Sequence, residues 1–344
     1  MFNSKKYKSK TDKSAESLDN SLEVKAERGF TNKKVPRKIV FIYMVFLVIL
    51  TLFVLVRVEG SKMSGLSTYA KGPLFEVIPS GEILEKNQTQ YFAPTITIRE
   101  VSNLEVVKLK LANKPLLSNK KMTTNTANYK NLSATLDMEA SKKNALAASI
   151  ALNGGVKSET NVVISNIDEE GPAYRAGLRI GMSILEINGQ RVHQPEEIVS
   201  IARRSQNIEV KTLQSETVFD VKLEAGSLGL KLITAPSGKL PSIDVVLNKV
   251  GGSSAGLVMG LAIYDSLTPG RLTKLSKVSG SGQITADGRI FPIEGIEEKL
   301  AAAQASGVEV FFLSKSQEFN YKGTQMKVVK VSNLKEAVAY LRNN

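Results

Sequence analysis

The sequence predicts an α+β multidomain protein with one N-terminal transmembrane helix. Residues 39–56 form an uncharged and almost wholly apolar run. At 1.5 Å per residue, this run is about as long as the hydrocarbon core of a bilayer is thick. Between residues 162 and 223, short β-branched runs are separated by turns rich in glycine and asparagine. After residue 228, strand patterns alternate with helical ones, which is typical of a domain that combines helices with a sheet.

The composition narrows the classes of function. The chain has 344 residues, a hydrophobic content of 42% and a net charge of +13. A basic chain suits nucleic acid or an anionic membrane surface. Because no nucleic-acid motif occurs, we favour contact with membrane lipid and expect no nucleic-acid partner. The absence of cysteine and the single histidine, His193, argue against disulfides and zinc sites, so we expect no metal and no cofactor.

The N-terminal part predicts a tail and an anchor. Residues 1–38 are rich in lysine and poor in large apolar residues, which predicts a disordered basic cytoplasmic tail. Residues 39–57 are predicted to be a transmembrane anchor. Basic residues crowd its N-terminal side, and this orients the N-terminus to the cytoplasm. No small-residue cleavage site follows directly, so we expect an uncleaved single-pass anchor in the cell membrane, with the rest of the chain outside the cytoplasm. A buried core helix is the alternative.

Residues 58–137 are predicted to form a mostly β membrane-proximal region. Residues 72–81 are bounded by turns as a strand would be, and residues 95–99 and 104–111 alternate between apolar and polar positions. Residues 113–131 are polar and are expected to be a surface loop. No chemistry is visible in this region.

Residues 138–225 are predicted to form a small β domain that begins with a helix over 138–152. A strand over 162–167 follows, then Gly171-Pro172-Ala173, a hairpin that turns at Asn188-Gly189, and a helix from Pro195. The order Gly-Pro-Ala, Ala-Gly-Leu, Asn-Gly resembles that of a bacterial PDZ domain. One departure is Met182, where the family usually has aspartate.

The PDZ resemblance implies a peptide-binding site. PDZ domains bind an extended peptide as an added strand. The implied groove lies between the strand near Val162 and the helix from Pro195, with a carboxylate-binding loop at Gly154 and Gly155. The alternative is a domain that only spaces the remainder of the chain from the membrane. We expect His193 to be a surface residue.

Residues 226–344 contain a candidate nucleophile. A strand over 243–247 and a helix over 257–267 flank a turn, Gly251-Gly252-Ser253-Ser254-Ala255-Gly256. Ser254 would therefore lie beside free backbone N–H groups and the positive end of a helix dipole. N–H groups in the turn, at Gly252, Ser253 and Ala255, could stabilise an oxyanion. The alternative is an ordinary capped helix start.

A serine nucleophile needs a base, and lysine is the remaining choice. His193 lies in another domain and there is no cysteine. Lys299 precedes an alanine-rich helix over 300–305, and it could serve as a base if burial lowers its pKa. Glu294 would oppose this if it lay close to the amine. A solvated helix lysine is the alternative.

Three motifs here resemble the proteolytic domain of Lon-type serine peptidases. They are the turn around Ser254, the run Ser-Gly-Ser-Gly-Gln at 279–283, and the run Pro-Ile-Glu-Gly-Ile-Glu-Glu-Lys at 292–299. The resemblance implies a nucleophile at Ser254 and a catalytic lysine at Lys299. Ser281 stands where the family usually has a threonine that orients the lysine. Ser253 replaces a usual proline, and Glu294 replaces a usual glycine.

We therefore expect a membrane-anchored serine endopeptidase with a Ser-Lys dyad. Because the chain has no ATP-binding motif, the expected substrates are exported peptides and unfolded or membrane-protein segments presented by the PDZ domain. The Lon resemblance also makes a homo-oligomer unsurprising. The alternative function is an inactive, membrane-tethered PDZ protein in which Glu294 keeps Lys299 charged.

Overall fold

The computed structural model describes residues 36–61, 63–81, 84–85, 88–118, 124–247, 251–320 and 325–344. The tail predicted over residues 1–38 lies almost wholly outside them. The chain divides into two compact units. One contains residues 1–62 with 102–104, and the other contains residues 63–101 with 105–344.

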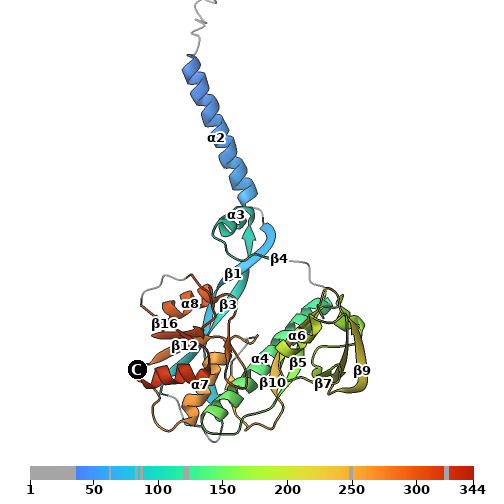
Figure 1. Ribbon diagram of the computed structural model, residues 1–344. Helices are drawn as coiled ribbons and strands as arrows, with labels where there is room; N and C mark the ends of the chain where they lie inside the picture. Colours follow the sequence, from blue (N-terminus) through green and yellow to red (C-terminus); the bar gives the residue numbers. More distant parts are fainter. Residues whose placement is uncertain are drawn as a thin grey trace, which may run out of the picture. The chain divides into compact units, whose positions relative to one another are not determined.

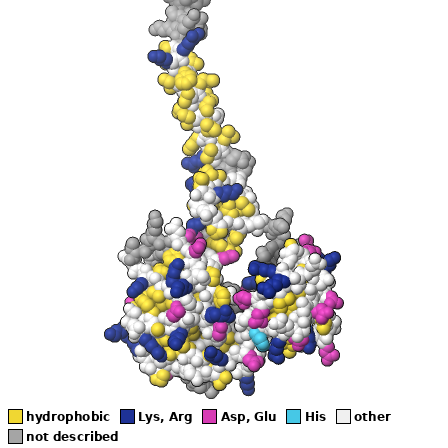
Figure 2. Space-filling model, in the orientation of Figure 1, with side chains coloured by type: hydrophobic (Ala, Val, Ile, Leu, Met, Phe, Trp, Pro, Cys, Tyr) yellow, Lys and Arg dark blue, Asp and Glu magenta, His cyan; other side chains and the backbone are white. Residues whose placement is uncertain are grey.

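Helix α2 (Arg37–Ser61) is the main described element of the first unit. Its segment from Arg37 to Arg57 is long and apolar enough to cross a membrane, and it is not buried inside the protein. Hydrophobic side chains cover its surface (Figure 2). This exposure argues against the alternative of a core helix, because the apolar face of a core helix would be covered.

A six-stranded sheet forms the centre of one half of the second unit, the half that contains residues 251–344. Its order is β16-β15-β12-β3-β1-β4, and β3, β12, β15 and β16 run parallel to one another. All five residues of β15 are buried, as expected for a central strand covered on both faces. The strands are β1 (Met63–Glu76), β3 (Gln90–Ser102), β4 (Leu117–Ser118), β12 (Lys277–Ser281), β15 (Val310–Ser314) and β16 (Lys327–Val331).

The region predicted as membrane-proximal therefore contributes to this sheet. Strand β3 pairs with β12, and the Ser279 hydroxyl donates to the carbonyl oxygen of Phe92 at 2.7 Å. The strand predicted over 104–111 is wrong, because residues 103–111 form helix α3 (Asn103–Leu111). Leu, Glu and Lys at these positions are good helix formers, and their propensity outweighs the short alternation.

Helix α4 (Thr124–Leu152) begins before the predicted start at residue 138 and includes part of the predicted loop. It packs against α7 of the half that contains the six-stranded sheet and against β10 and β5 of the other half (Figure 1). The Ser149 hydroxyl donates to the Gly260 carbonyl at 2.9 Å, and the Asn144 amide donates to the Thr234 carbonyl at 2.8 Å. The two halves therefore share one helix.

The second sheet has the order β10-β5-β6-β8-β9, with β7 paired to β6. The predicted hairpin turns at Asn188 and Gly189, whose φ angles are 52° and 74°. Both are left-handed, as a two-residue type I′ turn requires. The elements are β5 (Thr160–Ile167), α5 (Pro172–Arg175), β6 (Ser183–Ile187), β7 (Gln190–Arg191), α6 (Pro195–Ala202), β8 (Asn207–Thr212), β9 (Ser215–Lys222) and β10 (Leu230–Pro236).

Strand β10 lies beyond the predicted domain boundary at residues 225 and 226. It pairs antiparallel with β5, from Leu230 opposite Ile167 to Pro236 opposite Thr160. The small β domain therefore takes its outer strand from the segment that we assigned to the proteolytic domain. Without this strand, one edge of β5 would be left unpaired.

Helix α7 (Gly256–Leu267) is the core helix of the half that contains the six-stranded sheet, and all of its residues except Leu267 are buried. Helix α9 (Leu334–Arg342) closes the domain. The Asn333 side chain caps α9 by accepting a hydrogen bond from the Glu336 N–H at 3.0 Å. The remaining elements are β2 (Ile78–Ser80), β11 (Asp244–Val246), β13 (Gln283–Ile284), β14 (Ile290–Phe291) and α8 (Ile296–Ala305).

Replacing Gly256 with alanine should destabilise the protein by about 1–3 kcal/mol, because the start of α7 is tightly packed. An added Cβ would lie 2.6 Å from Cγ2 of Ile284 and 2.8 Å from Oγ of Ser141. Gly238→Ala is the matched control, since nothing lies within 4 Å of its added Cβ. Urea denaturation of both variants measures the difference. Equal stability of the two variants would contradict the packing described here.

Candidate active site

The turn that contains Ser254 lies between β11 and α7. It is hydrogen-bonded to Gly282, which lies between β12 and β13. Gly252 has a φ of 88°, a left-handed conformation that favours glycine. The Gly282 N–H donates to the Ser254 carbonyl at 2.9 Å, and the Leu257 N–H donates to the Gly282 carbonyl at 3.0 Å. These two bonds fix the backbone on both sides of the serine.

Helix α4 supports the same turn from the other side. The Ser141 hydroxyl donates to the Ser253 carbonyl at 3.1 Å. The Gly252 N–H donates to the Ala134 carbonyl at 3.1 Å, so this predicted oxyanion donor is occupied. Among the described residues, the N–H groups of Ser253, Ser254 and Ala255 donate to no acceptor. They are the donors in the turn that remain available to a ligand.

Lys299 brings the second predicted group to this turn. Its Nζ atom donates to Ser254 Oγ at 2.8 Å and to Ser281 Oγ at 3.1 Å. The Ser281 hydroxyl donates in turn to the Ser254 carbonyl at 3.0 Å. No hydrogen bond in the described part of the chain joins Lys299 to Ser253. The structure thus brings together Ser254, Ser281 and Lys299 and distinguishes Ser254 from its neighbour.

Burial governs the charge of this lysine. Lys299 is 3% exposed, and desolvation lowers its pKa from 10.5 to about 8. Lys299 makes no ion pair with a carboxylate of the described residues. A substantial fraction of the amine can therefore be neutral near pH 8, which is what a general base requires.

Glu294, which we expected to oppose a neutral Lys299 if it lay close, is hydrogen-bonded to another residue. The hydroxyl of Tyr69 on β1 donates to Glu294 Oε2. Burial, followed by this hydrogen bond and the nearby negative charge, raises the pKa of Tyr69 to about 12. The carboxylate of Glu294 is therefore held by a tyrosine that sequence reasoning did not find.

The two glutamates that open α8 share a partner of their own. Lys114 Nζ pairs with Glu297 Oε2 and lies 3.2 Å from Glu298 Oε1. The pair to Lys114 is the largest cause of the lowered pKa of Glu297. These side chains are partly buried, so this arrangement is screened less than a surface ion pair.

Ser254 and Lys299 line a cleft of about 620 Å³. Its apolar wall includes Phe75, Ile96 and Ile293. Asp137 and Lys231 also line it and form an ion pair with each other. No three His, Cys, Asp or Glu side chains gather into a metal-binding group in the described part of the chain.

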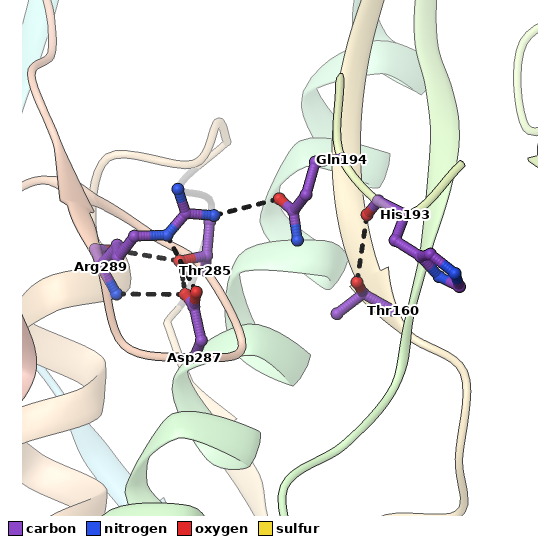
Figure 3. Close-up of polar contacts among 6 residues, drawn as sticks. All are labelled: Thr160, His193, Gln194, Thr285, Asp287 and Arg289. Carbon is purple, nitrogen blue, oxygen red and sulfur yellow. Dashed lines mark hydrogen bonds and ion pairs between the residues drawn. The ribbon is translucent and has the colours of Figure 1, made fainter. Parts of the chain in front are cut away.

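His193 lies outside this cleft, on the small β domain, and is exposed as predicted. Its carbonyl oxygen accepts a hydrogen bond from the Thr160 hydroxyl at 3.2 Å. The imidazole points away from Arg289, which bonds the neighbouring Gln194 at 3.1 Å (Figure 3). Asp287 holds the guanidinium of Arg289 at 2.9 Å.

The residues predicted to bind a peptide do not form an open site. Val162 is paired on both edges of its strand, opposite Thr234 and Ile184. The Gly154 and Gly155 N–H groups donate to carbonyl oxygens in the last turn of α4, at 3.3 and 2.9 Å. These groups therefore cap a helix and are unavailable to a carboxylate, and the predicted strand has no free edge.

Two family models match this chain. The PDZ domain model matches residues 163–215. The model described as the Lon protease (S16) C-terminal proteolytic domain matches residues 234–339. The chain carries a PDZ domain and a Lon-type proteolytic domain. The predicted fold class and the two resemblances are confirmed.

Individual relatives match this chain over part of their length. Lon protease 2 of Borreliella burgdorferi is 28% identical over 202 residues, which cover 54% of this chain and 24% of that protein. The Lon protease of Roseiflexus castenholzii is 37% identical over 84 residues, or 24% of this chain and 9% of that protein. The magnetosome formation protease MamE of Magnetospirillum gryphiswaldense is 28% identical over 119 residues, which cover 30% of this chain and 15% of that protein. This chain therefore spans about a quarter or less of each of these relatives.

Several groups around the Lon-type site lie outside the matched segment. Ser254, Ser281 and Lys299 fall within residues 234–339. Tyr69, Lys114 and the supporting residues of α4 precede it. Ser141, a serine on helix α4, was a weak signal. Tyr69 and Lys114 gave no signal, because only the pairing of β1 and β3 with the distant sheet brings them close.

Replacing Lys299 with methionine should stabilise the folded chain at pH 7 by about 1–3 kcal/mol, because a desolvated charge is removed. The folded pKa lies near 8 and the unfolded one near 10.5, so the unfolded wild-type chain binds more protons between these values. Wild-type stability therefore rises with pH across this window, and the advantage of the variant shrinks. Urea denaturation at several pH values from 7 to 10.5 measures this. A constant difference would contradict a lowered lysine pKa.

Proposed function

We propose that this protein is a membrane-anchored serine endopeptidase that uses a Ser254–Lys299 dyad and needs no ATP. One observation carries the proposal. The buried amine of Lys299 lies 2.8 Å from the Ser254 hydroxyl and has no ion-pair partner among the described residues. This is the geometry of a nucleophile with its general base.

The proposed reaction begins when the neutral amine takes the proton of Ser254. The serine oxygen then attacks the peptide carbonyl carbon, and the resulting oxyanion is stabilised by N–H groups of the turn, such as those of Ser254 and Ala255. The C–N bond breaks as Lys299 returns the proton to the leaving amine. Water, deprotonated by the same lysine, hydrolyses the ester and regenerates the serine. Ser281 holds the amine in position throughout.

The proposed substrates are exported peptides and unfolded or membrane-protein segments. A cleft whose lining includes Phe75, Ile96 and Ile293 suits an extended chain, and a chain without an ATP-binding motif has no evident means of unfolding stable proteins. The apolar helix α2 supports anchoring in the cell membrane with a cytoplasmic N-terminus. For the PDZ domain we propose substrate presentation at β10, because β10 is the outer strand of the sheet and contacts α6. Self-association is a further expectation from the Lon resemblance.

The alternative of an inactive, PDZ-only binding protein depended on Glu294 keeping Lys299 charged. The bond between Tyr69 and Glu294 counts against it, since that carboxylate already has a partner. The lowered pKa of Lys299, caused by burial alone, counts against it as well.

Ser254→Ala should abolish cleavage of an unfolded model protein such as casein, with a loss of at least about 10³-fold in kcat. Ser253→Ala is the matched control and should retain most activity, because its hydroxyl makes no bond with Lys299. The measurement is the appearance of new peptide termini with the full-length chain in detergent. Activity that survives in the Ser254 variant, or disappears in the Ser253 variant, would refute the assignment of the nucleophile.

The rate should also depend on pH in one direction. Because the lysine must be neutral, kcat/KM should rise with pH through a midpoint near 8, the lowered pKa of Lys299. Initial rates from pH 6 to 10 measure this profile. A profile that falls over this range would exclude Lys299 as the general base.

A further inference from the structure

Three carboxylates lie within five residues of Lys299, and each has a partner from the segment 63–118. Glu294 accepts from Tyr69, whereas Glu297 and Glu298 both bond Lys114. Segment 63–118 lies outside the span matched by the Lon-type model, which begins at residue 234. Two residues of this segment, Tyr69 and Lys114, therefore bond all three of the carboxylates.

The segment also fixes where α8 begins. Gly295, immediately before α8, has a φ of 66°, and an added Cβ there would lie 3.0 Å from the Ile96 side chain on β3. Strand β1 packs against α8. Because Lys299 lies in the first turns of α8, strands β1 and β3 determine the position of its amine relative to Ser254.

We propose that Tyr69 and Lys114 are positioning residues of this active site. They hold three neighbouring carboxylates away from the amine of Lys299, those of Glu294, Glu297 and Glu298. The inference rests on the proposed function, because it concerns the base of that reaction. It adds a requirement for two residues that lie far before the matched span in sequence. It thereby makes Tyr69 and Lys114, from the segment 63–118, part of the catalytic unit.

The charges around the amine determine in which direction the pKa of Lys299 should change if these contacts are lost. Glu294 lines the same cleft as Lys299, so a Glu294 side chain released by Tyr69 can turn its charge into that cleft. A negative charge near the amine favours its protonated form. The other charged groups of the cleft, Asp137 on α4 and Lys231 on β10, already pair with each other. They contribute little net charge of either sign.

The test is a comparison of pH–rate profiles in full-length variants. Tyr69→Phe should move the acidic limb of kcat/KM upward by about 0.5–1 pH unit, which lowers the rate at pH 7 by about threefold to tenfold. The rates should converge with wild type above about pH 9.5, where the amine is neutral in both. Damage to packing would instead lower the plateau at high pH.

Glu294→Gln supplies the decisive background. Tyr69→Phe should shift the profile only when Glu294 is present, so the effect should vanish in the E294Q background. Lys114→Met provides an independent double-mutant cycle. It should also shift the pH–rate profile upward, and this shift should vanish in the E297Q/E298Q background. Lys211→Met, which removes an ion pair with Glu186 on the PDZ domain, is the matched control and should leave the profile unchanged.

Two results would overturn the inference. One is a wild-type profile in both Y69F and K114M. The other is an unchanged shift after the carboxylates are replaced, which would mean that the tyrosine and the lysine act only through packing. If Y69F does not fold, the K114M cycle decides alone. Failure of the proposed function looks different, because wild type itself would then show no Ser254-dependent cleavage.

Discussion

The structure depends on the burial of one amine. Lys299 is almost wholly removed from water, and desolvation alone lowers its pKa to about 8. A buried cation is costly unless it is paired, and a paired one could not serve as a base. The surroundings meet both constraints, since hydroxyl groups of Ser254 and Ser281 bond the amine and no carboxylate of the described residues does.

Local patterns in the sequence were sufficient to predict much of this site. The glycine-lined turn, the strand around Ser281 and the helix at Lys299 are each encoded by neighbouring residues, and the structure brings these three groups together. Propensity and turn chemistry also predicted the hairpin at Asn188 and Gly189, since both must adopt left-handed angles.

Most of the errors have one physical cause, which is pairing between distant segments. The alternation over residues 95–99 predicted a strand but could not show that β3 pairs with β12. For the same reason the sequence did not predict that Tyr69 lies beside Glu294. The strand of Val162 was predicted to have a free edge for a peptide, but β10 pairs with that edge. At residues 104–111 a short alternation competed with helix propensity, and the helix prevailed.

The pairing of β3 with β12 also determines when the site can form. Phe92 and Ser279 are joined by a hydrogen bond that spans 187 positions in sequence. Contacts of such long separation close large loops and form late in folding. The PDZ segment between them, including its outer strand β10, precedes β12 in sequence and can fold as the chain is made. Ser254 therefore meets Lys299 only after most of the polypeptide has been synthesised, so under the proposed function a nascent chain has no assembled dyad before that stage.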